Sequence, residues 1–427
     1  MIILLFFFAG FDESLLSLVK LFLIMAIPYI EQVNAFALSV LIMMFLLVGE
    51  YLASLLLKKK VFEFSDTITN AACGIIERGI YILFAFAYFG AFDYVYQFRL
   101  MTIPNTWWTF IILFFAVDLL WYLYHISGHL INVLWAAHIT HHQSEQYNFS
   151  LSFRVSSPQL FIRVFFWMLL PFLGFDPLVT ILVIGGNSTY QFFIHTRLVG
   201  NLGILEHVLT TPSHHRVHHG KNPKYIDKNY GGIFIIWDKL FGTFQKEEEE
   251  VEYGITKSLN SYNPLIAWFH YYIDLYYASK MEQGTMNKLK IWFAGPETLK
   301  KYYNSLPEKQ YQPNTLNTSL KWYLALQFSL LFLLCIFMFK WYGSIFGNKE
   351  LLYLIAFCSF SGVSYSAVLE NKAYSIYLEV VRISLTAALI AYLTVVLSSP
   401  LYLWVGIAYA VVFLTWLVQL KGKLLNY

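Results

Sequence analysis

Long apolar stretches alternate with shorter polar segments along the chain. A membrane-spanning helix needs about 20 mostly apolar residues. Three stretches of this kind occupy the first third of the sequence, and four close it: 34–57, 71–94, 106–123, 322–341, 351–369, 376–397 and 401–420. The pattern predicts an all-α integral membrane protein, built as a multi-span helical bundle.

One further apolar stretch, Leu160–Ile194, is interrupted by Pro171, Gly174 and Pro177. Proline and glycine end or bend helices, so we expect two short spans or a re-entrant hairpin. The N-terminal MIILLFFFAGFDES lacks the basic region and small-residue cleavage site of a signal peptide. We therefore expect it to stay on the chain, in the lipid or at its surface.

The polar segments divide the chain into four parts. We expect N-terminal spans in 1–104, a histidine-rich domain in 105–260, a polar connecting segment in 261–318 and a four-span membrane region in 319–427. The connecting segment closes with the Pro/Asn-rich stretch YQPNTLNTS.

Basic residues predict the orientation of these spans. Lys58, Lys59 and Lys60 follow the first main span, and lysine-rich loops face the cytosol. Counting spans from this point places the histidine-rich domain on the cytosolic side, together with Lys421 and Lys423 near the C-terminus. We therefore expect that domain to face the cytosol.

Composition agrees with a membrane protein and excludes other classes. Of the 427 residues, 58% are hydrophobic and only 13% are charged, against about 25% charged in average soluble proteins. The net charge of +3 and the lack of a basic block argue against a nucleic-acid partner. The three cysteines form no CxxC pair and no disulfide framework.

Histidine is concentrated in one window of the chain. Eleven of the twelve histidines lie between residues 125 and 219, and five of them fall in HISGHLINVLWAAHITHH, which begins at residue 125. Within this window the spacings are those of one helix face, i, i+4 or i, i+3, i+4. The candidate ligands are His125, His129, His138, His141, His142, His195, His215, His218 and His219, with His214 as a further candidate.

This spacing predicts a metal site. Neutral imidazole is the commonest metal ligand, and nine imidazoles are too many for one ion, so we expect two metals in a shared site. Ligand type alone suits zinc, copper, iron or nickel. A pH-sensing cluster would not need the repeated spacing. A metal transporter or metal-binding membrane protein is the alternative class, although transport sites usually lie near the bilayer midplane.

Other polar residues near these histidines are candidate parts of the site. Asp118 lies two turns before His125 in an apolar span, where a charged group is costly and by default functional. We expect its carboxylate to hold a ligand imidazole. Asn187 and Gln191 precede His195 by eight and four residues, and either line the site or form a polar helix seam.

Three further predictions concern single charged residues. Glu145 follows the second histidine cluster and is expected to orient a ligand or to lie in solvent. Arg154 is a candidate for binding a lipid headgroup or a cofactor carboxylate, or an interfacial arginine that reaches toward water. Glu50 is expected to pair with the lysines at 58–60. Scaffold roles are expected for Asp227, Asn229 and Asp238.

The motifs HxxxH, HxxHH and HxxHH, in this order after an apolar helix, resemble the fatty acid hydroxylase and sterol desaturase superfamily of membrane di-iron oxygenases. Within it, WAAHITHHQSEQYNFS, QFFIHT, TPSHHRVHHGKN and YIDKNYGGIFIIWDKLFGTF are similar to the alkylglycerol monooxygenase family. The resemblance implies two iron ions in 105–260 that activate O2 and oxidise a C–H bond of a membrane lipid. It also implies a multi-pass protein of the bacterial inner membrane or the endoplasmic reticulum.

The resemblance leaves two sources of electrons open. The alkylglycerol family uses tetrahydrobiopterin and cleaves an ether lipid, whereas other branches hydroxylate or desaturate sterols, fatty acyl chains or carotenoids with a redox partner protein. The alkylglycerol enzymes carry an arginine after the first motif histidine and a glutamate after the second. Here these positions are Ile126 and Leu130.

Overall fold

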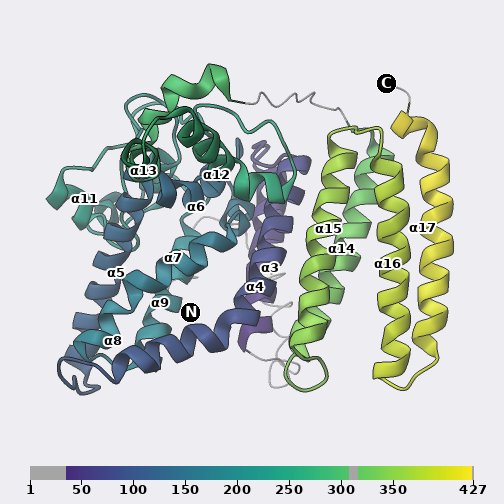
Figure 1. Ribbon diagram of the computed structural model, residues 1–427, viewed down its shortest axis with the longest axis horizontal. Coiled ribbons are helices and arrows are strands. Elements are labelled where there is room, and N and C mark those ends of the chain that lie inside the picture. The colour runs from purple at the N-terminus through teal and green to yellow at the C-terminus, as the bar shows by residue number, and fades with distance from the viewer. Residues whose placement is uncertain (1–34, 307–315, 426–427) are drawn as a thin grey trace.

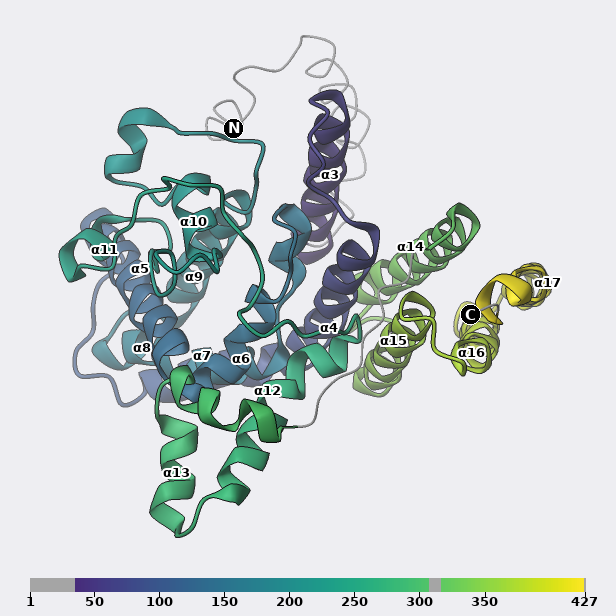
Figure 2. The same ribbon diagram turned by 90° about the horizontal axis from the view of Figure 1, so that it is seen from above.

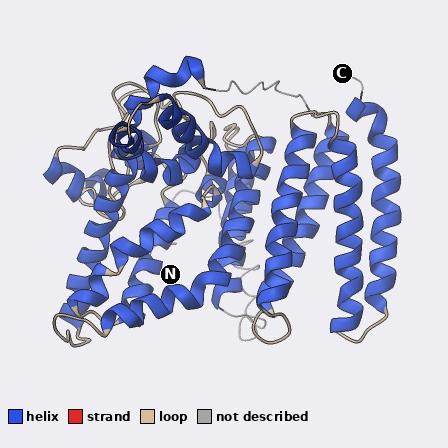
Figure 3. Cartoon of the chain, viewed as in Figure 1, coloured by secondary structure: helices blue, strands red, loops and turns tan. Residues whose placement is uncertain are grey.

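The computed structural model describes residues 35–306 and 316–425, and within them it contains helices and loops but no β-strand (Figure 3). The expected N-terminal lipid segment and most of the YQPNTLNTS linker lie outside the described residues. The α-helices are α3 (Ala35–Leu56), α4 (Phe64–Tyr96), α5 (Trp107–Leu130), α6 (Asn132–His142), α7 (Ser157–Trp167), α8 (Leu169–Leu173), α9 (Pro177–Phe193), α10 (Pro212–His218), α11 (Ile236–Phe241), α12 (Pro264–Met281), α13 (Thr285–Phe293), α14 (Thr318–Lys340), α15 (Asn348–Leu369), α16 (Ser375–Val396) and α17 (Leu401–Leu425). Short 3₁₀ helices are η1 (Phe149–Phe153), η2 (Gly203–His207) and η3 (Pro296–Ser305).

The predicted multi-span architecture is confirmed. Six helices of the described chain are long and apolar enough to cross a membrane: Phe64–Ala85, Trp107–Leu130, Thr318–Lys340, Asn348–Leu369, Ser375–Val396 and Leu401–Leu420. A shorter apolar helix covers Ile42–Leu56 within the first expected span.

The helices form a histidine-bearing part and a C-terminal row of four helices (Figure 1). The two meet where α15 packs along α4, with a core that includes Ile76, Leu324 and Phe357. Figure 2 shows α16 and α17 beyond α15, on the side away from the histidine-bearing part. Their small residues allow close packing, since a Cβ on Gly406 would lie only 2.7 Å from the Ala387 carbonyl oxygen.

A buried polar network ties the C-terminal row together. The Arg382 guanidinium pairs with Glu379 at 2.6 Å, and both side chains are almost fully buried. Ser364 donates to Glu379 at 2.7 Å, and the Gln327 amide oxygen accepts from Arg382 at 3.0 Å. Because an unpaired charge inside a bundle is very costly, these contacts hold α14, α15 and α16 in one arrangement.

The broken apolar stretch forms a helical hairpin of α7, α8 and α9. Its turn contains Gly174, with φ of +119°. A Cβ there would lie 2.1 Å from the Met101 carbonyl oxygen, so only glycine fits. The turn is held to the α4–α5 connection by backbone hydrogen bonds from Leu100 to Phe172 and from Ile103 to Gly174.

The long helices share one polar end. The C-terminal ends of α3 and α5, the start of α4 and the C-terminus of the chain lie toward the top of Figure 1. Of the segments that follow α5, α6 and α11 to α13 lie toward this end, whereas α8 lies at the opposite end (Figure 1).

Candidate metal centre

The first motif lies at the end of α5. His125 and His129 are one turn apart on the same helix face, and both are buried. The Nδ1 atom of His125 lies 2.8 Å from the Tyr230 carbonyl oxygen. Since a carbonyl only accepts, this nitrogen carries the proton and the Nε2 lone pair points inward, as a metal ligand requires.

The second motif lies on α6, which begins directly after α5. His138, His141 and His142 share one face of this short helix. The Nε2 atom of His138 lies 3.0 Å from Nε2 of His125 and 3.2 Å from Nε2 of His142. On the outer side of the ring, the Gln159 amide nitrogen of α7 lies 2.9 Å from His138 Nδ1.

The remaining ligand candidates come from α9 and α10. His195 follows α9, and its Nδ1 atom donates to the Gln191 carbonyl oxygen at 2.6 Å. Its Nε2 atom lies 3.0 Å from Nε2 of both His141 and His215. His218 is oriented in the same manner as His125, because its Nδ1 atom donates to the Lys228 carbonyl oxygen at 2.9 Å.

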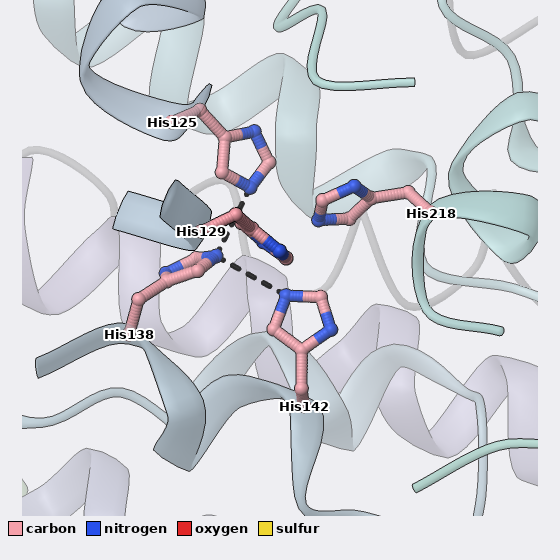
Figure 4. A group of neighbouring side chains, drawn as sticks. All are labelled: His125, His129, His138, His142 and His218. Atoms are coloured by element: carbon pink, nitrogen blue, oxygen red, sulfur yellow. Dashed lines mark hydrogen bonds between the residues drawn. The ribbon is translucent and has the colours of Figure 1, made fainter. Parts of the chain in front are cut away.

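The nine histidines converge in two adjoining groups. In each group one nitrogen per residue lies within 4.8 Å of the others. The five-histidine group, drawn in Figure 4, contains His125, His129, His138, His142 and His218. The four-histidine group contains His141, His195, His215 and His219. The groups touch where the rings of His142 and His219 stack, with centroids 4.4 Å apart.

Unpaired ring nitrogens show that these groups fit metal ions. Among the described residues, the buried Nε2 atoms of His129, His218 and His219 have no hydrogen-bond partner. The Nδ1 atoms of His141 and His215 have none either, while their Nε2 atoms face His195. A buried polar atom without a partner costs about 1–3 kcal/mol. Imidazole nitrogens that converge without protein partners are the donor set of a metal centre.

The electrostatics of the cluster favour the neutral ligand form. Burial, and after it the neighbouring imidazoles, holds the pKa of His138, His142 and His218 well below the usual range. Burial also lowers the pKa of His195 to about 4. At neutral pH these rings are therefore uncharged, and their lone pairs are ready to bind a cation.

Asp118 does not contact an imidazole, so the expectation that it holds a ligand ring is wrong. Its carboxylate accepts hydrogen bonds from the backbone N–H groups of Ile233 and Phe234, the Trp237 indole and the Asn187 amide, at 2.6–3.0 Å. Two turns of helix separate Asp118 from His125, and its carboxylate is hydrogen-bonded to the loop at 233–237 instead. Asp118 therefore holds the loop whose Tyr230 carbonyl orients His125.

Asn187 and Gln191 continue this network. The Asn187 amide donates to Asp118 at 2.7 Å, and the Gln191 amide donates to Asn187. Gln191 reaches the site through its backbone, because its carbonyl oxygen accepts from His195. Its side chain also lines a cavity at the histidines.

The three expected scaffold residues shape the loop between α10 and α11. Asp238 accepts from the backbone N–H groups of Tyr230 and Gly231, both at 2.7 Å. Asn229 donates to the His214 and Gln245 carbonyl oxygens. Asp227 lies at the edge of the site, with a carboxylate oxygen 3.7 Å from Nδ1 of His129.

The structure does not bring three predicted residues into the centre. Arg154 is buried, and its guanidinium donates to Thr140, Asn70 and Gln143, which leaves it committed to the protein. Glu145 is exposed, and its carboxylate accepts a hydrogen bond from the Ser258 hydroxyl at 3.4 Å. His214 lies outside both groups, because its ring accepts the Thr211 N–H at the start of its own helix.

Two carboxylates support the site, the buried Glu50, which differs from expectation, and the half-buried Glu247. Glu50 does not pair with the lysines at 58–60 but accepts from the Phe149 N–H at 2.6 Å and from the Thr196 hydroxyl. Glu247 forms a bidentate pair with Arg216. Arg216 also donates to the Thr196 and Val199 carbonyl oxygens, so the segment after His195 is held from two sides. In the sequence, the only sign that Glu50 has a structural role was its position inside an apolar stretch.

Two cavities reach the centre from different sides. The polar cavity, of about 440 Å³, is bounded by His129, His142, His218 and His219 together with residues of α12, η3 and the 254–260 loop. The membrane cavity, of about 340 Å³, is bounded by the other five histidines and by residues of α4, α5, α7 and α9. Each of the nine histidines therefore lines one cavity, and the centre lies between a cavity bounded by α12, η3 and the 254–260 loop and a cavity bounded by the long helices.

Comparison with known proteins agrees with this geometry. The sequence model of the fatty acid hydroxylase family matches residues 110–243. Alkylglycerol monooxygenase from Homo sapiens is 37% identical over 271 residues, which cover 63% of this chain and 59% of that protein. The enzyme of the same name from Danio rerio is 40% identical over 236 residues, covering 55% and 53%. That from Caenorhabditis elegans is 32% identical over 356 residues, covering 75% and 69%.

The match to the human and zebrafish proteins thus spans less than two thirds of their length. No solved structure matches the chain.

Proposed function

The chain belongs to the alkylglycerol monooxygenase family, and from this premise we propose that it is a membrane di-iron monooxygenase of ether lipids. The observation that carries the proposal is the convergence of nine imidazoles in two adjoining groups. In this proposal the five-histidine group and the four-histidine group each hold one iron ion. When bound, the iron pair supplies the activation of O2.

The protein groups have separate tasks in this scheme. The carbonyl oxygens of Tyr230, Gln191 and Lys228 each accept a hydrogen bond from a ring N–H, so that the opposite nitrogens of His125, His195 and His218 face the metals. The membrane cavity takes the lipid and keeps bulk water away from the reacting carbon. Asp118 and Glu50 hold the segments that carry these groups.

The reaction that fits the relatives' name inserts one oxygen atom into the C–H bond next to an ether oxygen. One atom of O2 enters the lipid and the other leaves as water, which consumes two electrons and two protons from outside the chain. The resulting hemiacetal breaks its C–O bond and yields a fatty aldehyde and glycerol.

The two electrons come from a reductant, for which we propose tetrahydrobiopterin. The polar cavity supports this proposal, because its walls combine rings of Trp135 and Tyr303 with carboxylates of Asp227 and Glu297 beside four of the ligands. Rings can stack on a pterin, and carboxylates accept hydrogen bonds from its N–H groups. Leu130 also lines this cavity, where the family resemblance places a glutamate, so a redox partner protein is the competing donor.

We further propose that the centre faces the cytosol, in a bacterial inner membrane or the endoplasmic reticulum. The lysines at 58–60 follow α3 at the polar end of the long helices, which is the end that carries the histidines (Figure 1). Lysine-rich ends stay in the cytosol.

An assay with separated electron donors tests the proposal. Membranes containing the protein are given a 1-O-alkylglycerol and O2, with reduced pterin or a reduced ferredoxin or cytochrome as sole donor. We expect fatty aldehyde with the pterin alone. Product only with the redox protein would overturn the pterin assignment, and hydroxylated sterol, acyl or carotenoid product in place of aldehyde would overturn the ether-lipid assignment.

A further inference from the structure

The membrane cavity carries charged groups that the metal centre does not use. Its walls are mostly apolar, yet they include Glu77 and Arg78 of α4 and Arg163 of α7. A charged group among apolar helices is costly and is by default functional. Their presence in a cavity that ends at five ligand histidines calls for a ligand with polar atoms.

Arg163 lies close to the metal centre along one helix face. Gln159, Arg163 and Trp167 are successive i, i+4 positions of α7, and all three line the cavity. Gln159 contacts the outer nitrogen of His138, so Arg163 lies one turn, about 6 Å, further along the helix axis. Trp167 stacks on Trp121 with ring centroids 6.2 Å apart, and this pair bounds the cavity beyond Arg163.

Arg163 also differs from the buried arginines of the protein. Arg154, Arg216 and Arg382 each have a carboxylate within 4 Å, from Asp66, Glu247 and Glu379 respectively. In the described part of the chain, the half-buried guanidinium of Arg163 has no carboxylate within 4 Å and donates no hydrogen bond. Its five N–H donors are therefore available to a molecule in the cavity.

We propose that Arg163 is a headgroup anchor: its guanidinium donates hydrogen bonds to oxygen atoms on the polar end of the lipid. This inference rests on the proposed function and adds a specificity-determining residue to it. Anchored at Arg163, one helical turn beyond Gln159, a glycerol headgroup leaves its ether oxygen, a few bonds away, on the side of the metals. Arg78, whose guanidinium lies 3.5 Å from the Glu77 carboxylate, adds a donor and an acceptor to the same wall.

The oxygen atoms that Arg163 binds have two chemical sources, free hydroxyls or a phosphate. Binding of radiolabelled lipids to the purified, iron-loaded full chain in detergent distinguishes them. The probes are a 1-O-hexadecylglycerol, its phosphate ester, and the same lipid with both hydroxyls methylated. Binding is measured without reductant, so no turnover takes place.

We expect the wild-type protein to bind a hydroxyl- or phosphate-bearing lipid about tenfold or more tightly than the methylated lipid, as charged hydrogen bonds imply. Arg163→Met should remove this preference and leave binding of the methylated lipid unchanged, which also shows that the variant is folded. Arg163→Lys should restore part of it. Arg99→Met, which changes an exposed arginine outside the cavity, should behave as wild type.

The lipid that loses affinity in Arg163→Met shows which oxygen atoms Arg163 binds. Loss of affinity for the diol indicates free hydroxyls, and loss for the phosphate ester alone indicates phosphate. An unchanged preference in Arg163→Met would overturn the proposal. A protein that binds the diol through Arg163 but releases no aldehyde would refute the proposed reaction and leave the anchor standing.

Discussion

The carboxylate of Glu50 in α3 accepts a hydrogen bond from the hydroxyl of Thr196, 146 residues later in the chain. The same carboxylate accepts the Phe149 N–H, and Thr196 follows His195 directly. Glu50 thus fastens the segment that carries a ligand of the four-histidine group to a helix of the N-terminal region.

We predict that Glu50→Leu loosens the four-histidine group. Two buried donors lose their acceptor, at about 1–3 kcal/mol each, and His195 loses its support. Iron content, measured by elemental analysis of purified protein, should fall from about two toward one per chain, with a lower thermal unfolding temperature. Glu50→Gln, which keeps an acceptor oxygen, should retain most of the iron; equal loss in both variants would contradict this explanation.

The two-group geometry predicts two metal ions per chain. Elemental analysis of fully active protein should give about two irons, and a chelator should abolish activity that added ferrous iron restores. A ratio of one or less at full activity would exclude a two-metal centre.

Single histidine substitutions should abolish turnover without preventing membrane insertion. His138→Ala, His142→Ala and His218→Ala each remove a ligand from the five-histidine group, whereas insertion depends on the apolar helices. His207→Ala is the matched control, since His207 is exposed and lies outside both groups. Turnover and membrane content are measured together. Normal turnover in the three ligand variants would refute direct ligation.

Asp118 should matter for stability and ligand orientation together. Asp118→Leu leaves four hydrogen-bond donors without their acceptor, so we expect the free energy of unfolding to fall by about 3 kcal/mol or more. Because the loop it holds orients His125, iron should be lost as well. Asp118→Asn keeps one acceptor oxygen and should lie between wild type and Asp118→Leu in both measurements. Full iron retention in Asp118→Leu would show that the loop held by Asp118 is not needed to position the metal ligands.

Low pH should lower the stability of the metal-free protein, because its buried imidazoles are held in the neutral form. Burial lowers the pKa of His195 to about 4, against about 6.5 in an unfolded chain. Between these values the unfolded state binds the proton first, so stability falls as pH drops below about 6.5, by about 3 kcal/mol for this residue at pH 4. Thermal unfolding of the metal-free protein from pH 7.5 to 5 measures this loss. His195→Gln should reduce the pH dependence, and an unchanged pH dependence in this variant would contradict the explanation.

Local sequence determined the helices and the ligand set. A membrane-spanning helix is recognised in the sequence as about 20 consecutive apolar residues. Lipid cannot hydrogen-bond to the backbone, so the segment must form a helix that satisfies its own backbone groups. The four C-terminal spans were accordingly predicted to within a few residues of α14 to α17. The spacing within each motif likewise places His138, His141 and His142 on one face of α6, because helical periodicity is a local property.

Contacts between distant segments were decided only by the tertiary structure. The sequence does not say that His141 joins His195 and His215 while its neighbour His142 joins His129 and His218. Nor does the sequence show that Asp118 accepts hydrogen bonds from the loop at 233–237, or that Glu50 accepts one from Thr196. It also does not show that the Arg154 guanidinium is hydrogen-bonded within the protein while that of Arg163 is not. The direction in which a buried polar side chain points depends on which donors and acceptors the packed helices bring beside it. For Glu50 and Thr196 these come from segments 146 residues apart.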